Sequence, residues 1–196
     1  LKREREERRR KEQEKQEQIK AERERLKAQQ ETLRKALLDF QKAIGTRKDP
    51  GAMADDLRAL VETAKGLDPP FREFTAKTLA TTVYASQTVP AGRAAVLEAL
   101  GNLGHASALP YLAAALARDP DSSIRVTAAR ILAELGDRQA LPALHEALKS
   151  NDPAVVRAAL TGLARIESSS SLPYLMTALE AVSNRSRTFS SSTTTK

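Results

Sequence analysis

Apolar residues between Arg93 and Glu180 recur at the 3.6-residue spacing of one face of an α-helix. In the clearest stretch they stand at Ile124, Ala128, Ile131, Leu132 and Leu135, and the next stretch continues with Leu141, Leu144 and Leu148. No segment of strand length alternates apolar and polar residues. The pattern therefore predicts an all-α fold between about residues 53 and 182, built from amphipathic helices.

These helical stretches belong to three units of similar sequence, which begin at Arg93, Arg125 and Val156. A Leu-Pro pair marks the second helix of each unit and recurs after 32 and then 31 residues, at Leu109-Pro110, Leu141-Pro142 and Leu172-Pro173. A repeat of this length with helical spacing is typical of stacked helix pairs, because one pair cannot bury its apolar face alone. We therefore expect an α-solenoid of stacked antiparallel helix pairs.

Turn residues between the helical stretches support this division. Gly136 follows the last apolar residue of its helix and is expected to end that helix in the left-handed conformation. Asp137 can then open the next helix as an N-cap. Asp152-Pro153 supplies an N-cap acid followed by a proline at the first helical position, and Asp119-Pro120 repeats the pair. Each unit thus carries its own start and stop signals.

The three units resemble HEAT-like repeats of the short kind found in phycobilisome-lyase-type proteins, a family of right-handed helical solenoids. The resemblance rests on the Leu-Gly turn before Leu-Pro-x-Leu, on the Asp-Pro pairs, and on Ile124-Arg125 and Val156-Arg157. It covers about 90 of the 196 residues and extends more weakly back to residue 53. It implies a fold but no single function, because the family includes scaffolds, regulatory subunits, chromophore lyases and DNA-binding relatives of glycosylases.

The sequence divides into three parts. Residues 1–45 are expected to form a long charged helix, interpreted as a coiled coil or a stalk. Residues 46–182 are assigned to the solenoid, with degenerate repeats in 53–90 and clearer repeats in 91–182. Residues 183–196 are almost entirely Ser, Thr and Arg, which predicts a flexible tail.

The N-terminal part has no Pro or Gly before Gly45 and is rich in strong helix formers, so we expect one helix about 66 Å long. Residues 2–18 contain no apolar side chain and should project into solvent. Apolar residues then follow every seven positions, at Ile19, Leu26, Leu33 and Phe40. The candidate helix-pairing residues are Leu26, Leu33, Leu37 and Phe40, which either dock on the repeats or pair with another helix and so allow oligomerisation.

The excess positive charge lies entirely in this helix. Residues 1–48 hold 17 Lys and Arg against 10 Asp and Glu, whereas residues 49–196 hold 15 of each. Three interpretations are open: a solvated helix surface, placement beside an anionic membrane, and binding of nucleic acid. Interleaved glutamates and the absence of aromatic residues among these charges disfavour nucleic acid as a partner.

Sequence motifs for catalysis are missing. The chain has no Cys, and His105 and His145 stand alone in a turn and on a helix, so neither thiolate chemistry nor a His-based metal site is expected. No Gly-rich phosphate-binding motif occurs. The acids Asp119, Asp121 and Asp152 adjoin prolines or helix starts, where capping explains them. We therefore expect no enzyme activity, no cofactor and no metal.

The leading functional hypothesis is a non-enzymatic protein–protein interaction scaffold or assembly subunit. It would bind a protein partner on the solenoid face, through the N-terminal helix, or through both. On the solenoid, polar positions of successive first helices should line up as a partner-binding stripe of mixed charge. Its candidate residues are Glu98, Asn102, Arg130, Glu134, Thr161 and Arg165. The alternative is a nucleic-acid-binding HEAT-like protein that uses the basic N-terminal helix.

The cellular location is left open by the sequence. No apolar run reaches the length of a membrane-spanning helix. The chain begins at Leu1 within a charged helical pattern, so we expect a preceding segment that could hold a signal peptide or a membrane anchor. Cytoplasm, periplasm and association with a membrane through such a segment all agree with the absence of cysteine.

Overall fold

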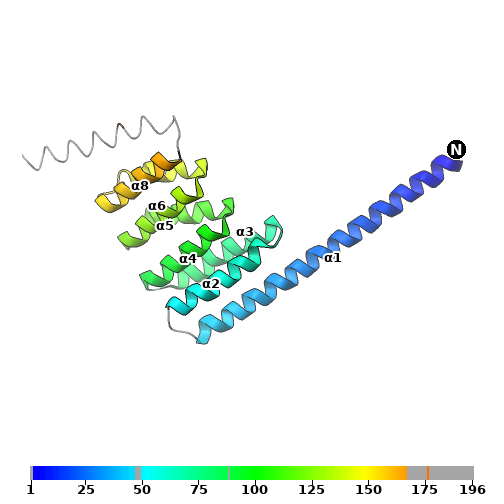
Figure 1. Ribbon diagram of the computed structural model, residues 1–196, viewed down its shortest axis with the longest axis horizontal. Helices are drawn as coiled ribbons and strands as arrows, with labels where there is room; N and C mark the ends of the chain where they lie inside the picture. The colour runs from blue at the N-terminus through cyan, green and yellow to red at the C-terminus, as the bar shows by residue number, and fades with distance from the viewer. Residues whose placement is uncertain (1, 47–49, 88, 167–175, 177–196) are drawn as a thin grey trace, which may run out of the picture.

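The computed structural model describes residues 2–46, 50–87, 89–166 and 176. All regular elements in these residues are helical and none is a strand, which confirms the all-α prediction (Figure 1). The α-helices are α1 (Lys2–Thr46), α2 (Pro50–Lys65), α3 (Pro69–Thr78), α4 (Pro90–Leu103), α5 (Leu109–Arg118), α6 (Ser122–Leu135), α7 (Leu141–Ala147) and α8 (Pro153–Arg165). A π-helical segment η1 (Leu79–Tyr84) continues α3, and 3₁₀ turns η2 (Ala106–Ala108) and η3 (Arg138–Ala140) precede α5 and α7.

The helices form two stacked layers. The first helix of each pair, α2, α4, α6 and α8, packs on the first helix of the next pair, while α5 packs on α7 in the second layer (Figure 1). Contacts of α5 with α6 and of α7 with α8 join the layers. This arrangement is the predicted solenoid. The predicted second helix of the third unit, after Pro173, lies outside the described residues except for Met176.

Glycine ends the first helix in two successive pairs. Gly104 and Gly136 have φ of 62° and 66° and cap α4 and α6 in the left-handed conformation. A side chain at these positions would be strained, because Cβ approaches the following carbonyl oxygen at positive φ. The expected role of Gly136 is thereby confirmed. Asp137 accepts a hydrogen bond from the Gln139 N–H at 2.8 Å and opens the 3₁₀ turn that leads into α7.

The two Asp-Pro pairs differ in their roles. Asp152 is the N-cap of α8, and its carboxylate accepts from the Ala154 N–H at 2.8 Å, as predicted. The same prediction for Asp119-Pro120 is wrong, because α6 begins at Ser122 and its N-cap is Asp121. Asp121 accepts from the Ser123 N–H at 2.8 Å, which provides the cap two residues later. Asp119 is thus left for a different contact.

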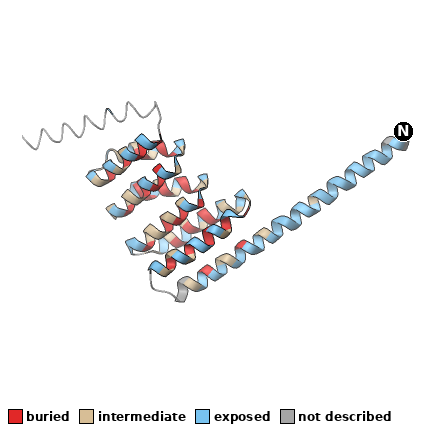
Figure 2. Ribbon diagram, viewed as in Figure 1, coloured by how far each residue is buried: buried red, intermediate tan, exposed pale blue. Residues whose placement is uncertain are grey.

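One apolar core runs through the stack between the layers (Figure 2). Leu132 and Leu144 are fully buried in it, at the level where α6, α7 and α8 meet. Glycine allows the first helices to approach closely: a Cβ on Gly101 of α4 would lie 2.5 Å from the Ile131 Cγ2 of α6. A Cβ on Gly162 of α8 would meet the Ala133 Cβ at 3.1 Å and the Leu144 Cδ1 at 3.2 Å, which is a tighter contact than usual but less severe. A larger residue at Gly101 would therefore force α4 and α6 apart or displace Ile131.

Helix α1 is a single helix with two environments. Its C-terminal half packs on α2 and α3, where Leu33 and Phe40 are buried at 3% and 4% exposure. The contact begins at Arg25, whose Nη2 lies 2.5 Å from the Asp68 Oδ2. Before Arg25 the helix leaves the stack, and the described side chains of Lys2–Glu24 are exposed except for the half-buried Ile19 (Figure 2).

Candidate protein-binding surfaces

Three residues of the expected stripe form one ion-pair cluster. The Arg130 guanidinium of α6 pairs with Glu98 of α4 and, at 2.7 Å from Nη1 to Oε1, with Glu134 one turn along α6. All three side chains remain 43–45% exposed, so each pair contributes only about 0–1 kcal/mol to stability. The cluster is a solvent-facing ridge of mixed charge over the α4–α6 contact.

The other three stripe residues lie on the same layer of first helices. Asn102 is exposed one turn beyond Glu98, where both line a shallow groove of about 160 Å³ between α2 and α4. Thr161 is exposed on α8 and donates its hydroxyl to the Arg157 carbonyl at 3.0 Å. Arg165 is exposed at the end of α8. Within the described residues, no hydrogen bond or ion pair joins these three to the Arg130 cluster.

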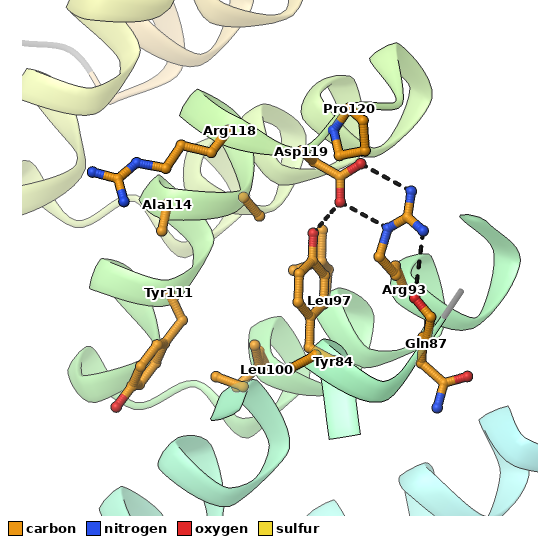
Figure 3. A pocket seen from close by; sticks show the side chains of 13 residues that line it. Tyr84, Gln87, Arg93, Leu97, Leu100, Tyr111, Ala114, Arg118, Asp119 and Pro120 are labelled. Carbon is orange, nitrogen blue, oxygen red and sulfur yellow. Dashed lines mark hydrogen bonds and ion pairs between the residues drawn. The ribbon is translucent and has the colours of Figure 1, made fainter. Parts of the chain in front are cut away.

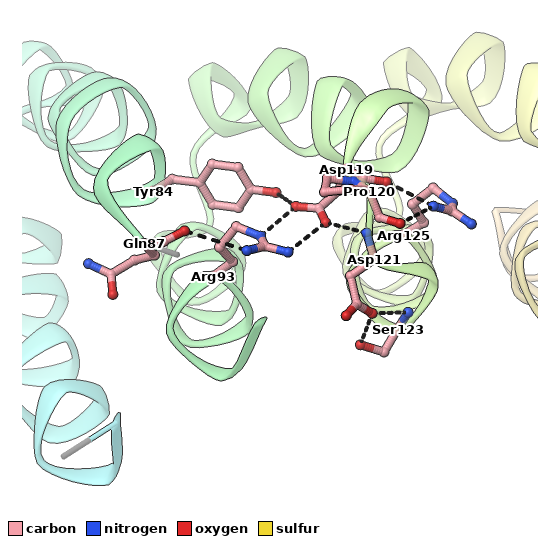
Figure 4. A network of polar contacts seen from close by, with 8 residues as sticks. All are labelled: Tyr84, Gln87, Arg93, Asp119, Pro120, Asp121, Ser123 and Arg125. Atoms are coloured by element: carbon pink, nitrogen blue, oxygen red, sulfur yellow. Dashed lines mark hydrogen bonds and ion pairs between the residues drawn. The ribbon is translucent and has the colours of Figure 1, made fainter. Parts of the chain in front are cut away.

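A buried polar network lies near the N-terminal ends of α4 and α6, away from the Arg130 cluster (Figure 4). Asp119, only 6% exposed, receives two bonds from Arg93, at 2.8 Å from Nε and 3.0 Å from Nη2. The Tyr84 hydroxyl donates to the same carboxylate, as does the Asp121 N–H at 2.9 Å. The π-helical segment η1 carries Tyr84 to this place. The carboxylate thus joins three successive helix pairs.

The charge state of this network fits a structural role. Burial alone would raise the pKa of Asp119, but hydrogen bonds from Arg93, Tyr84 and the Asp121 N–H hold it below its ordinary value. Burial, and then the hydrogen bond to Asp119, raise the pKa of the Tyr84 phenol well above its usual range. At neutral pH Asp119 is therefore an ionised acceptor and Tyr84 a protonated donor. Neither group is poised to accept or release a proton near neutral pH.

A second pair of the same kind occurs one repeat later. Arg125 lies 3.4 Å from the Asp152 carboxylate and donates to the Asp119 carbonyl at 2.8 Å, while the Ser122 hydroxyl bonds Asp152. The arginines are 32 residues apart and the aspartates 33. Sequence reasoning noted the Arg and the Asp-Pro positions separately. Because the arginines and the aspartates recur with nearly the same period, the sequence could have predicted that they pair with each other.

Beside the Asp119 network lies an open cavity of about 380 Å³ (Figure 3). Leu97 and Leu100 form its apolar floor, and Tyr84 stands over them with its hydroxyl turned to Asp119. Tyr111 and Arg118 line the cavity but point away from the network (Figure 3). Arg93, Tyr84 and Asp119 bond one another, so the floor beside them offers apolar packing more than ion recognition.

A larger groove of about 1000 Å³ runs between α5 and α7 on the layer of second helices. Small side chains form much of its wall, and its polar rim includes Arg118 and Glu146. The alanines are Ala113, Ala117, Ala143 and Ala147. Sequence reasoning placed no binding residue here. The alanines that follow each Leu-Pro pair were the available signal, because small residues at the surface of adjacent helices leave room between them.

The four candidate helix-pairing residues have unequal positions. Leu33 and Phe40 are buried against the chain's own repeats, and Leu37 is partly buried beside them. Leu26 remains 37% exposed. Of the two alternatives for this stretch, the structure shows docking on the repeats. Pairing with another helix stays a prediction that rests on the exposed side of α1.

Chemistry-bearing side chains elsewhere are dispersed. His105 caps η2 by accepting from the Ser107 N–H at 3.3 Å, and burial lowers the pKa of His145 in α7. Among the residues that the structure describes, no three His, Cys, Asp or Glu side chains gather as a metal site. Of the described helices, none combines the length and the apolar character that crossing a membrane requires.

Comparison with known proteins supports the repeat assignment. The family model of HEAT repeats matches residues 81–144 and 112–189, which together cover more than half of the 196-residue chain. A comparison with curated proteins gave no significant match. HEAT repeats generally mediate protein–protein interactions, and proteins built from them are typically not enzymes. The helix pairs, their period and this match agree, and the chain belongs to the HEAT-repeat family.

Proposed function

We propose that the chain is a non-enzymatic interaction scaffold. In this proposal the solenoid is a rigid body that holds a protein partner on the stripe of Glu98, Asn102, Arg130, Glu134, Thr161 and Arg165. Helix α1 is an arm that reaches a further protein of the same assembly. A helix that is anchored on the repeats at one end and solvated at the other can bind a second protein, because it presents a long surface at a fixed angle to the solenoid.

The division of α1 is the observation that carries the proposal. Lys2–Glu24 stands clear of the repeats, while Arg25 and Gln29 bond the Asp68 region at 2.5 and 3.1 Å and Leu33 and Phe40 are buried. Pairs such as Lys11–Glu7 at 2.8 Å and Arg10–Glu14 at 3.2 Å stabilise the projecting part locally. They also neutralise part of its positive charge, which favours a protein partner over phosphate.

Site-specific photo-cross-linking tests this proposal. A photoreactive amino acid replaces Gln16 on the arm or Thr161 on the stripe, and Thr82, which is exposed on η1, serves as the control position. In lysate of the native host we expect one or a few proteins to cross-link reproducibly at Gln16 or Thr161 and not at Thr82. Cross-links to nucleic acid, with binding that falls steeply as salt rises, would support the alternative function instead.

A further inference from the structure

An apolar groove lies between α1 and α3. Its volume is about 490 Å³. Leu33, Leu37 and Leu38 line it from α1, and Pro70, Phe71 and Phe74 line it from α3. Leu38 is 46% exposed and Phe74 54% exposed, although both are large apolar side chains. Exposed apolar side chains gathered in a groove between two helices mark an interaction site more often than isolated ones do.

A row of positive charges continues the α1 wall of the groove. Arg34 is the charged side chain among its lining residues; it is 72% exposed, and its Nη1 lies 3.8 Å from the Glu31 Oε2. Lys20, Arg23 and Lys27 precede Arg34 at helical spacing, so they continue the groove-facing side of α1 toward its N-terminus. All three are exposed. A ligand that lies along the groove therefore meets apolar side chains at one end and a basic row at the other.

We propose that this groove binds an amphipathic helix of a partner protein, whose apolar face enters between α1 and α3 and whose acidic residues face Lys20, Arg23, Lys27 and Arg34. The inference rests on the proposed scaffold function and names one of its contacts. A helix fits because the walls are themselves two helices, and a third can lay residues i, i+3, i+4 and i+7 between them.

The same observations argue against two other occupants. A second copy of this chain would bring a basic α1 against a basic α1, and residues 1–48 carry a net excess of seven positive charges. A membrane surface presents no ridge to fill a hollow between two helices, and basic helices bind membranes through a convex apolar face. Charge and shape together favour an acidic helix from another protein.

Peptide selection on the whole chain tests the inference. A displayed library of random peptides about four helical turns long is selected on the wild-type chain. Enriched peptides are then measured by fluorescence anisotropy against the wild type and three variants. We expect the enriched sequences to combine apolar residues at i, i+3, i+4 and i+7 with Asp and Glu.

Phe74→Glu and Leu38→Glu should each weaken binding about tenfold or more, equivalent to about 1.4 kcal/mol. Arg34→Glu should weaken it less.

Val89→Glu is the matched control, because Val89 is also 54% exposed but lies outside the groove, before α4. It should bind the peptides like the wild type. Circular dichroism checks that all four variants fold. The inference is overturned if no peptide is enriched, if the peptides are basic, or if Phe74→Glu binds them unchanged.

Two further measurements test whether the groove binds a second copy of the chain or a membrane instead. A dimer seen in sedimentation equilibrium and lost in Phe74→Glu would place a second copy there. Flotation with phosphatidylserine vesicles that Phe74→Glu abolishes would place a membrane there. Gln16 and Thr161 lie outside the groove, so cross-links there with no peptide binding would remove only this inference. Peptide binding without cross-links would remove the arm-and-stripe proposal instead.

Discussion

The two halves of α1 differ in composition and in what stabilises them: charged residues dominate the first half, and nearly all the apolar residues lie in the second. Lys2–Glu24 is held by local propensity and by ion pairs within the helix, such as Lys11–Glu7. From Arg25 onward the helix is held by α2 and α3, through Asp68 and through the burial of Leu33 and Phe40. The packed half begins where buried apolar residues enter the helix at Leu33 and Phe40, with Leu37 partly buried between them. A long charged helix is therefore best divided by its apolar spacing, not by its charge.

The buried ion pair of the solenoid provides the largest expected effect. Arg93→Met should lower the free energy of unfolding by about 3–5 kcal/mol, because it leaves the Asp119 carboxylate buried without its cation. Chemical denaturation measures this loss. Arg130→Met is the matched control and should cost at most about 1 kcal/mol, since its pairs with Glu98 and Glu134 are exposed. Equal losses in the two variants would contradict the assigned burial.

Removal of one anchor side chain tests the packed half of α1. Phe40→Ala should destabilise the chain by up to about 3–5 kcal/mol, through lost transfer free energy and a cavity between α1 and α2. Leu26→Ala should change stability by no more than about 0.5 kcal/mol, because Leu26 lies where the helix is leaving the stack. Thermal and urea unfolding measure both values. If Leu26→Ala cost as much as Phe40→Ala, the boundary of the anchored half would be misplaced.

Acid should weaken the solenoid through Asp119. The folded-state pKa of this carboxyl is lowered, so its contribution to stability is complete above the ordinary Asp value of about 3.9 and is lost as the pH falls toward the lower folded value. We expect the urea concentration at the unfolding midpoint of the wild type to decrease as the pH is lowered below about 4. Asp119→Asn should be less stable at neutral pH and should show a smaller fall. Parallel pH profiles for the two proteins would exclude Asp119 as a source of the dependence.

Deletion of residues 2–18 should have the smallest effect on the fold. These residues bury no described apolar side chain against the repeats, so the melting temperature should stay nearly unchanged. The same deletion should abolish co-purification of the protein that cross-links at Gln16 in the full chain, while leaving cross-links at Thr161. A truncated chain that unfolds would show that the projecting half supports the solenoid. Full binding of the arm's partner by the truncated chain would show that the partner contacts another surface.

Local features of the fold could be read from the sequence. Gly136 ends α6 and Asp152 begins α8 because a left-handed cap and an N-cap depend on the few residues around them. The period of the Leu-Pro pairs also predicted stacked helix pairs, because each unit has the same apolar face to bury. The error at Asp119-Pro120 arose where two acids, Asp119 and Asp121, compete for one cap.

The contacts between distant segments were decided only by the tertiary structure. Asp119 meets Arg93 and Tyr84, which lie 26 and 35 residues earlier, because η1 and the α4–α5 pair bring three chain segments to one point. Likewise, the spacing of Leu33, Leu37 and Leu38 marks an apolar side of α1, but the groove exists only because Phe71 and Phe74 of α3 form its second wall. Helical spacing determines which face of each helix is apolar. How two such faces are set against each other depends on the packing of the whole stack.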